Sequence, residues 1–555
     1  MNKLFRALVF LAMALPLIAC AQSVTATPSQ IPSPSATVTL TLVPTQTATA
    51  TIEPTPEHVQ PTLIPTIDPE LLHDLLNKAL SIQTVEVNGN SSQRITGWNY
   101  GFGTDIWYNY CPEYVWLDPN HILLYPGAGQ EYGPEGIWGI HNVVPQPVVL
   151  NLRSGTAWLP PVNRSPQPTC NWIFWSQELG ILITSEIHND VSTISTYTYD
   201  GQKISSYPGG SLNFSPSKTK ILVDGDTLID LGTGKQIKLN WSLENYDEQV
   251  LSGLFWTSDE TRIYRCCYFY ADLTTGISHR FERSDFHFPN GNHLDSSGLW
   301  FQNGFWVQAD KYFLVWWQAV DDGDIKYLPM FDPATKLFYD VRELAGIPED
   351  FTSLYTPVSP DGNYVWMEGW NESYLVNLAT FETQHYTYTN PYSYTDVDWS
   401  LDSKFAWFEI YDPDTKSTEV QILSIADMNM NSLPVIYQSE SEHLWHPSDN
   451  MVVYPAEDKN ALIFLDVSTM SFRELSFPDQ DSRYKISNLA WSPNGDKLIF
   501  ITESHTLWQV DHPALENLEQ IIASTDSIGG AQWSPDGKTI AFVNGSDIYI
   551  VDTTK

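Results

Sequence analysis

The chain has 555 residues, of which 17% are charged, below the roughly 25% usual for soluble domains, and 13% are aromatic. With 66 acidic and 28 basic residues, its formal net charge of −38 repels a phosphate backbone and argues against nucleic acid as a partner. The same charge would attract cations, basic peptides or basic polymers, although its simplest effect is to keep the protein soluble.

The N-terminus, residues 1–19, has the organisation of an export signal. Lys3 and Arg6 precede an apolar run, Ala7–Ile18, that is too short for a permanent membrane span, and the segment closes with Leu-Ile-Ala before Cys20. This arrangement resembles a bacterial lipoprotein signal. The resemblance implies cleavage before Cys20, diacylglycerol on its thiol and anchoring to the outer face of a bacterial membrane. An ordinary secretory signal with an incidental cysteine is the alternative.

Two short regions precede the main body. Residues 20–67 are nearly all Thr, Pro, Ser, Ala and Val, with too few large apolar groups to offset chain entropy, which predicts a disordered, proline-stiffened stalk. Asp68 then has the character of a helix N-cap and Pro69 that of a first helical residue, ahead of leucines at helical spacing. We expect one short helix over 68–81 and no other.

Residues 82–555 consist of repeated units. Each unit has an anchor position, usually aromatic, followed by a turn that reads S-P-D-G in its clearest copies. Successive anchors lie mostly 39–52 residues apart, which is the period of a β-propeller blade. The anchors are residues 116, 175, 214, 256, 306, 358, 399, 445, 491 and 533.

Each unit predicts four short antiparallel strands. A strand ends at the anchor, Pro and Gly of S-P-D-G supply a tight turn, and an alternating run such as Lys538–Phe542 begins the next strand. Asp547–Asp552 shows the third strand, and LGTGKQIKLNW in an earlier unit shows the turn into a fourth. The fold class is therefore all-β, a propeller of four-stranded blades whose aromatic residues fill the space between blades.

The repeat also carries a family resemblance. W-S-P-D-G-K-x-I-A-F followed by I-Y-x-V-D resembles the repeat of TolB-type, WD40-like propellers, and the match fades toward residue 110. The resemblance implies an architecture far more than a function. The turn residues that carry it are Trp533, Ser534, Pro535, Asp536, Gly537, Trp491, Ser492, Pro493, Gly495, Ser359, Pro360, Asp361 and Gly362.

The sequence leaves the number and closure of the blades open. About eight to ten repeats form either one large ring or two smaller rings, unless a weak anchor is false. The chain ends at Lys555, directly after the third strand of its last unit, which would leave an unpaired edge. We expect an N-terminal strand around Thr84–Val87 to complete that blade.

Few residues suggest chemistry. No G-x-S-x-G nucleophile motif occurs. Two histidine pairs are hypothetical metal sites, His443 with His446, and His287 with His293 between Asp285 and Asp295. The acidic turns at 321–324 and 412–414 could take Ca²⁺ but lack the spacing of a full calcium loop. The alternative is that these histidines and acidic residues belong to solvated loops or to the turns of the repeat.

The cysteines that remain after Cys20 suggest disulfides, because their number is even and the compartment is oxidising. We expect Cys111 to pair with Cys170, and Cys266 with its neighbour Cys267. Adjacent cysteines need an unusual backbone to form a bond, and reduced buried thiols are the alternative.

These observations favour a non-catalytic binding or scaffolding propeller at the cell surface, which meets a protein or a cell-wall glycan on one face. One alternative is a carbohydrate-active enzyme, a polysaccharide lyase or glycosidase, with its site in the central channel. A metal inside the ring, as in TolB-like oligogalacturonate lyases, would suit the lyase. A second alternative is an envelope assembly factor that acts as TolB does.

Overall fold

The computed structural model describes part of the chain. The described residues are 81–96, 114–125, 147–161, 173–188, 191–239, 254–265, 269–280, 301–317, 328–335, 337–348, 350–351, 353, 355–369, 372–387, 394–412, 417–433, 442–456, 460–477, 486–545 and 547–554. All belong to the second of the chain's two units, Met1–Pro69 and Glu70–Lys555. The export signal with Cys20, the stalk, the expected helix except Ser81, and the other four cysteines lie outside these ranges.

The last repeat unit shows why the sequence forms blades. β38 (Ile528–Trp533) ends at the anchor Trp533, which lies opposite Ile540 of β39 (Thr539–Asn544). β40 (Asp547–Asp552) continues the antiparallel sheet, which is blade 10. Ile540–Val543 are all buried, although side chains alternate between the two faces of a strand. Both faces of the sheet are therefore covered, as expected for a blade between two others.

Within the described residues, the strands form ten antiparallel sheets, one for each anchor. Blade 1 contains β3 (Tyr114–Asp118), β4 (His121–Leu124), β5 (Val148–Asn151) and β6 (Ala157–Trp158). Blade 2 contains β7 (Ile173–Ser176), β8 (Ile181–His188), β9 (Val191–Thr198) and β10 (Lys203–Pro208). Blade 3 contains β11 (Leu212–Phe214), β12 (Lys220–Val223), β13 (Thr227–Asp230) and β14 (Gln236–Lys238). Blade 4 contains β15 (Leu254–Trp256), β16 (Arg262–Arg265), β17 (Phe269–Asp272) and β18 (Ile277–Arg280).

The next five blades continue in chain order. Blade 5 contains β19 (Phe301–Val307), β20 (Tyr312–Trp317), β21 (Pro329–Asp332) and β22 (Leu337–Asp340). Blade 6 contains β23 (Tyr364–Glu368), β24 (Glu372–Asn377) and β25 (Thr383–Thr387). Blade 7 contains β26 (Tyr394–Trp399), β27 (Phe405–Asp412), β28 (Ser417–Ser424) and β29 (Asn429–Ser432). Blade 8 contains β30 (Leu444–Trp445), β31 (Met451–Pro455), β32 (Ala461–Asp466) and β33 (Ser471–Ser476). Blade 9 contains β34 (Ile486–Trp491), β35 (Lys497–Thr502), β36 (Thr506–Asp511) and β37 (Glu519–Ala523).

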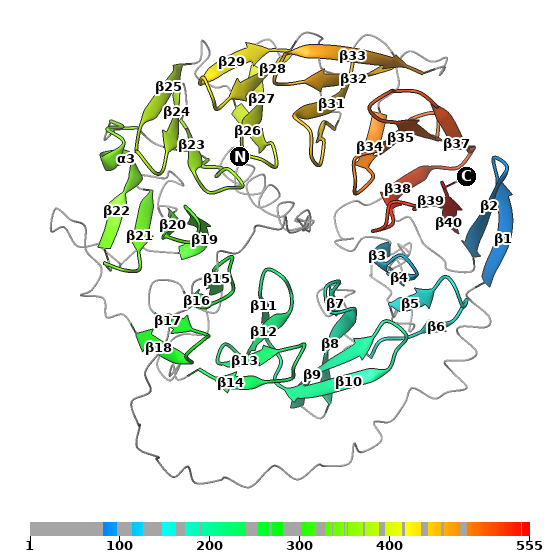
Figure 1. Ribbon diagram of the computed structural model, residues 1–555, viewed down its shortest axis with the longest axis horizontal. Coiled ribbons are helices and arrows are strands. Elements are labelled where there is room, and N and C mark those ends of the chain that lie inside the picture. Colours follow the sequence, from blue (N-terminus) through cyan, green and yellow to red (C-terminus); the bar gives the residue numbers. More distant parts are fainter. Residues whose placement is uncertain are drawn as a thin grey trace, which may run out of the picture. The chain divides into compact units, whose positions relative to one another are not determined.

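The ten blades form one ring, in which the first strand of each blade lies toward the centre and the last toward the rim (Figure 1). This arrangement confirms the propeller and selects the single large ring over two smaller ones. All ten anchors are genuine. Nine lie in a first strand, and Val358 marks blade 6, where isolated bridges from Tyr355 to Glu368 and from Val358 to Val365 replace a full first strand.

The N-terminal segment closes the ring, although not through the strand that we expected. β2 (Asn90–Thr96) pairs directly with β40, with Ser92 opposite Val551 and Ile95 opposite Ile548. β1 (Ser81–Val87), which contains Thr84–Val87, pairs with β2 and is the fifth strand of blade 10. The expectation that Thr84–Val87 pairs with the last strand was therefore wrong. A hairpin at Asn88-Gly89 reverses the chain, so that the following strand, β2, pairs with β40 instead.

One helix was missed. α3 (Val341–Leu344) is a single turn after β22, and the Asp340 side chain caps it by accepting the N–H of Arg342 at 3.1 Å. Arg342 is buried, and its guanidinium donates to the carbonyl of Phe351 at 2.8 Å. The turn thus fixes the connection from blade 5 to blade 6. Within the described ranges, the chain has no helix that is long and apolar enough to cross a membrane.

The core lies between adjacent blades. Trp366 of blade 6 and Phe408 of blade 7 are fully buried, and their ring centroids are 4.5 Å apart. Tyr114 of blade 1 donates its hydroxyl to carbonyls of blade 10, those of Gly530 and Ala541. Because burial of one large apolar side chain contributes about 1.5–3 kcal/mol, the interfaces between blades supply most of the ring's cohesion.

Candidate functional site

The first loop of blade 10 shows what the S-P-D-G sequence does. The buried hydroxyl of Ser534 donates to Oδ1 of Asp536 at 2.7 Å and accepts an N–H from the start of β39 at 3.0 Å. Gly537 has a φ of +69°, in the left-handed region that favours glycine. The indole N–H of Trp533 donates to the carbonyl of Ala490 in blade 9 at 3.1 Å. These residues build the turn and attach it to the preceding blade.

The other clear copies of the motif make the same contact. A hydroxyl at the Ser position donates to the side chain two residues later in four further blades. The pairs and distances are Ser359 with Asp361 at 2.6 Å, Ser492 with Asn494 at 2.9 Å, Ser400 with Asp402 at 2.9 Å and Thr257 with Asp259 at 2.6 Å.

Neighbouring first loops also bond to each other. The N–H of Asp361 in blade 6 donates to Oγ of Ser403 in blade 7 at 2.9 Å. The N–H of Ser258 in blade 4 donates to the carboxylate of Asp310 in blade 5 at 2.6 Å. The motif residues that resemble chemistry therefore join successive blades.

A second motif, which the sequence analysis missed, shapes the loop after the third strand. Asp272 accepts the N–H groups of Thr274 and Thr275, both at 2.9 Å, and Asp466 accepts those of Ser468 and Thr469. The hydroxyl of Thr274 and these N–H groups hold the pKa of Asp272 below its ordinary value. An Asp or Asn as the last residue of the third strand, present in eight of the ten described blades, was the available signal. In an antiparallel sheet, the loop after the first strand and the loop after the third strand lie at the same end of the strands. Both motifs therefore lie on one side of the ring, which we call the turn face.

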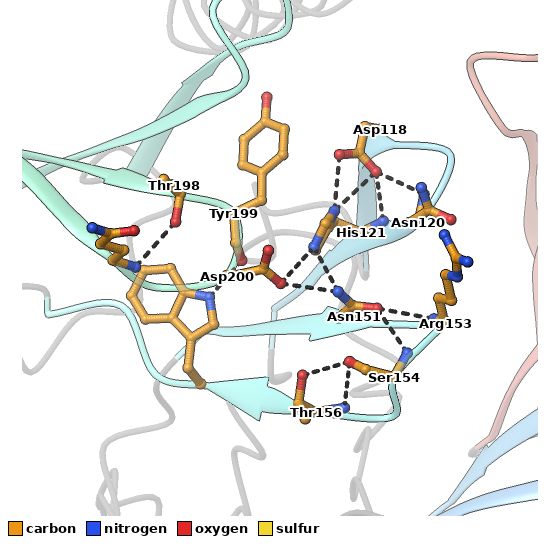
Figure 2. Close-up of polar contacts among 12 residues, drawn as sticks. Asp118, Asn120, His121, Asn151, Arg153, Ser154, Thr156, Thr198, Tyr199 and Asp200 are labelled. Atoms are coloured by element: carbon orange, nitrogen blue, oxygen red, sulfur yellow. Dashed lines mark hydrogen bonds and ion pairs between the residues drawn. The ribbon is translucent and has the colours of Figure 1, made fainter.

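The first histidine cluster joins blades 1 and 2 on the turn face, and Figure 2 shows His121 between two carboxylates. Its Nδ1 lies 2.8 Å from Asp118, the last residue of β3, and its Nε2 lies 3.1 Å from Asp200 of blade 2. Asn151 donates to Asp200 at 2.9 Å. The hydrogen bonds from Asn151 and His121 hold the pKa of Asp200 below its ordinary value. These contacts link blade 1 to blade 2.

The second cluster joins blades 7 and 8. His443, directly before β30, has Nε2 3.1 Å from Asp398 of β26 and Nδ1 3.4 Å from Glu409 of β27, and its ring stacks on Trp407 with centroids 4.3 Å apart. Burial lowers the pKa of His443, but the hydrogen bonds that the ring donates to the carboxylates of Asp398 and Glu409 outweigh this effect and raise the pKa to about 9. Asp398 is 53% exposed on an inner strand, so this cluster reaches solvent through one carboxylate.

The third cluster joins blades 8 and 9. His446 occupies the Ser position of the repeat, and its Nδ1 accepts the N–H groups of Ser448 at 3.2 Å and Asp449 at 2.9 Å. Its Nε2 lies 3.1 Å from the carbonyl of Gly495 in the next blade, so Nε2 carries the proton and donates. His512 of blade 9 lies nearby, with Nε2 3.4 Å from the Asp449 carboxylate.

These placements separate the predicted pair His443 and His446. His443 faces blade 7 and His446 faces blade 9, so the two histidines do not form one site. His446, Asp449 and His512 have donor atoms within 4.8 Å of one another, a spacing that could suit a metal. However, the turn's own N–H groups occupy the lone pair of His446 Nδ1. The third cluster therefore forms a hydrogen-bonded joint between blades 8 and 9.

The remaining predicted sites lie mostly beyond the described residues. His287, His293, Asp285, Asp295 and the acidic turn at 321–324 fall in undescribed ranges. Of the turn at 412–414, only Asp412 is described, as the last residue of β27. In the part of the chain that the structure describes, both ring nitrogens of His121, His443 and His446 have a partner, and at least one nitrogen of each ring reaches the neighbouring blade.

Comparison with known proteins adds little to this geometry. No family model matches the chain, and no curated protein matches it. Solved structures similar to it include dihydro-heme d1 dehydrogenase NirN in complex with DHE, with 10% identity, a TM-score of 0.31 and coverage of 67% of this chain and 69% of that one. The extracellular domain of the putative one-component system BT4673 from B. thetaiotaomicron has 10% identity, a TM-score of 0.27 and coverage of 86% and 82%. A chain of the mitotic checkpoint complex has 10% identity, a TM-score of 0.26 and coverage of 56% and 92%. The fold assignment stands on the strand order rather than on these alignments.

Proposed function

We propose that this protein is an exported, lipid-anchored binding or scaffolding propeller of TolB-like type, held at the outer face of a bacterial membrane through Cys20. Its turn face meets a protein or a cell-wall glycan and does not transform it. The lipoprotein-type N-terminus and the long Thr/Pro-rich stalk support the location.

The observation that carries the proposal is the use of the reactive side chains. Both ring nitrogens of His121, His443 and His446 have partners, and at least one of the two lies in the neighbouring blade. The Ser and Asp residues of the repeat hold turns. Catalysis by a histidine needs a nitrogen that can take or give a proton to a substrate, and these nitrogens already have partners.

Charge suggests the kind of partner. The net charge is −38, and the first loops expose carboxylates on the turn face. The exposed carboxylates of these loops include Asp259, Asp361, Asp402, Asp449, Asp496 and Asp536. Lys404 and Lys538 neutralise part of this charge through Asp402 and Asp536. A partner with cationic groups, a basic protein surface or an amino-bearing glycan, would be attracted to this face.

A photo-crosslinking residue tests the face and the partner together. Leu401, exposed in the first loop of blade 7, is replaced by a photoreactive amino acid, and Ile277, exposed on the outer strand β18, is the matched control. In envelope preparations, we expect the Leu401 probe to capture one partner, less at high salt, and the Ile277 probe to capture none. Equal capture by both probes, or by neither, contradicts the proposal. Recovery of a membrane-protein peptide would favour the assembly factor over glycan binding.

A further inference from the structure

We propose that the first loop of blade 5, residues 308–310, is a strained clasp that both neighbouring blades hold, so that its release on one side also releases it on the other. The inference concerns the ring itself and is independent of the proposed function. It starts from the backbone of the clasp, whose three residues all have a positive φ although none of them is glycine.

The backbone of the clasp is held in an unfavourable conformation. Gln308, Ala309 and Asp310 have φ of +52°, +50° and +64°, and no other three successive residues of the described chain share this conformation. It brings each Cβ close to the following carbonyl oxygen, which disfavours it by about 5- to 30-fold for each residue. Such strain persists only where the surrounding structure holds it, so the contacts of the clasp decide its conformation.

The other blades show that the turn itself does not need this strain. The position of Asp310, four residues after the anchor, is a glycine with positive φ in three blades, at Gly362, Gly495 and Gly537. In two further blades it is Glu260 and Ser403, also with positive φ. Glu260 accepts the N–H of Ser217 in the preceding blade at 2.6 Å, and Ser403 accepts that of Asp361 at 2.9 Å. A side chain at this position therefore gives up an unstrained turn for a contact with the preceding blade.

Asp310 holds the clasp to blade 4. Asp310 is 8% exposed, and its carboxylate accepts both the N–H and the hydroxyl of Ser258 at 2.6 Å. Hydrogen bonds to a carboxylate are roughly twice as strong as those between neutral groups. Ser258 belongs to the first loop of blade 4, so this contact joins one turn directly to the next.

Gln308 holds the clasp to blade 6. Its N–H donates to the carbonyl of Gly362 at 3.1 Å, and its side-chain amide donates to the carbonyl of Leu378. A Cβ at Gly362 would lie 2.9 Å from Cα of Val307, so the turn of blade 6 rests on the backbone that enters the clasp. Because both hydrogen bonds start from Gln308, they form together only while its φ stays positive.

The two sides are therefore coupled through the strained backbone. If Asp310 lost Ser258, the clasp would relax toward an ordinary turn, in which Gln308 does not reach both of its acceptors. Blade 6 offers few other restraints here, because among the described residues its first strand is reduced to the bridges of Tyr355 and Val358. The clasp thus gives the ring an element with two states at blades 4–6, closed on both sides or released on both.

Hydrogen–deuterium exchange of the full chain tests the clasp through two amides. Asp310→Ala removes the carboxylate, so the Ser258 amide, its direct partner, should lose protection by about tenfold or more. The Gln308 amide should lose a similar factor, although its own acceptor in blade 6 is unchanged. Ala309→Gly should act in the opposite direction and protect both amides by about fivefold, because glycine adopts this conformation without strain.

Ser403→Ala is the matched control. It removes the acceptor of an N–H from the preceding blade at the same position of the repeat, but from a loop with a single residue of positive φ. Only the Asp361 amide, the direct partner of Ser403, should therefore lose protection.

Three results would overturn the proposal. The first is unchanged protection of the Gln308 amide in Asp310→Ala, because the two sides would then be independent. The second is unchanged or weaker protection in Ala309→Gly, because the loop would then store no strain. The third is a loss in Ser403→Ala that spreads beyond Asp361, because coupling would then need no clasp. If Asp310→Ala fails to fold, Asp310→Asn keeps an oxygen acceptor without the charge and should show the same pattern with a smaller factor.

Discussion

The closing strand β2 supports a quantitative prediction. Ile95 is 1% exposed and packs in the cluster that joins blades 10 and 1, with Trp116 and Ile548 among its neighbours. Ile95→Ala removes three buried carbons and costs about 3 kcal/mol when the site cannot collapse. Since each 1.4 kcal/mol is a factor of ten, the β2 and β40 amides should exchange more than about a hundredfold faster.

Ile204→Ala on β10 is the matched control. Ile204 is 49% exposed, and its truncation should change protection by little more than about twofold, since surface substitutions stay within about 0.5 kcal/mol. Hydrogen–deuterium exchange resolved by peptide separates the closing blade from the others. If Ile95→Ala changes exchange in β40 no more than Ile204→Ala does, β2 does not close the ring and the reasoning fails.

Three further predictions concern the loops and clusters. Gly495→Ala should destabilise blade 9 by more than about 2 kcal/mol in urea titrations, because Gly495 has a φ of +76° and an added Cβ would overlap the His446 ring. Combining it with His446→Ser should relieve the overlap but not the backbone strain. Ser534→Ala removes a buried hydroxyl that both donates and accepts a hydrogen bond, and should lower the free energy of unfolding by about 1–2 kcal/mol in the same titration. An unchanged free energy of unfolding would refute this role of the hydroxyl. His443 has a folded pKa of about 9, above the 6.5 of free histidine, so its contribution, at most about 3 kcal/mol, is complete below pH 6.5 and lost as pH rises through 9. The stability difference between wild type and His443→Gln should therefore shrink between pH 7 and 10, and a constant difference would contradict the cluster.

Periodicity predicted the blades well, because each first strand ends in a large anchor before a turn with few conformational solutions. Even Val358, which lacks an aromatic ring, was found by its S-P-D-G turn. The closing strand was harder to locate. β2 reads NSSQRIT, and only Ser92 and Ile95 are buried, so no apolar pattern distinguishes it from the adjacent β1.

The candidate site was the least predictable part. His443 and His446 are three residues apart and suggested one cluster, but the chain between them is a strand whose side chains reach opposite neighbours. The carboxylates that surround His443 come from β26 and β27, far from it in the sequence. The sequence showed only that His446 occupies the Ser position of the repeat, which correctly indicated a turn. The joining of blades by these side chains depends on which strands the ring brings side by side.

The central claim is that this propeller binds its partner and leaves it chemically unchanged. Mass spectrometry of wall glycans and envelope proteins, before and after incubation with the purified full chain, tests it most directly. The account predicts that the retained partner is recovered with an unchanged mass. A cleaved or unsaturated product that forms with the wild type and disappears with Asp398→Asn would contradict the account and indicate an enzyme at the inner wall of the ring.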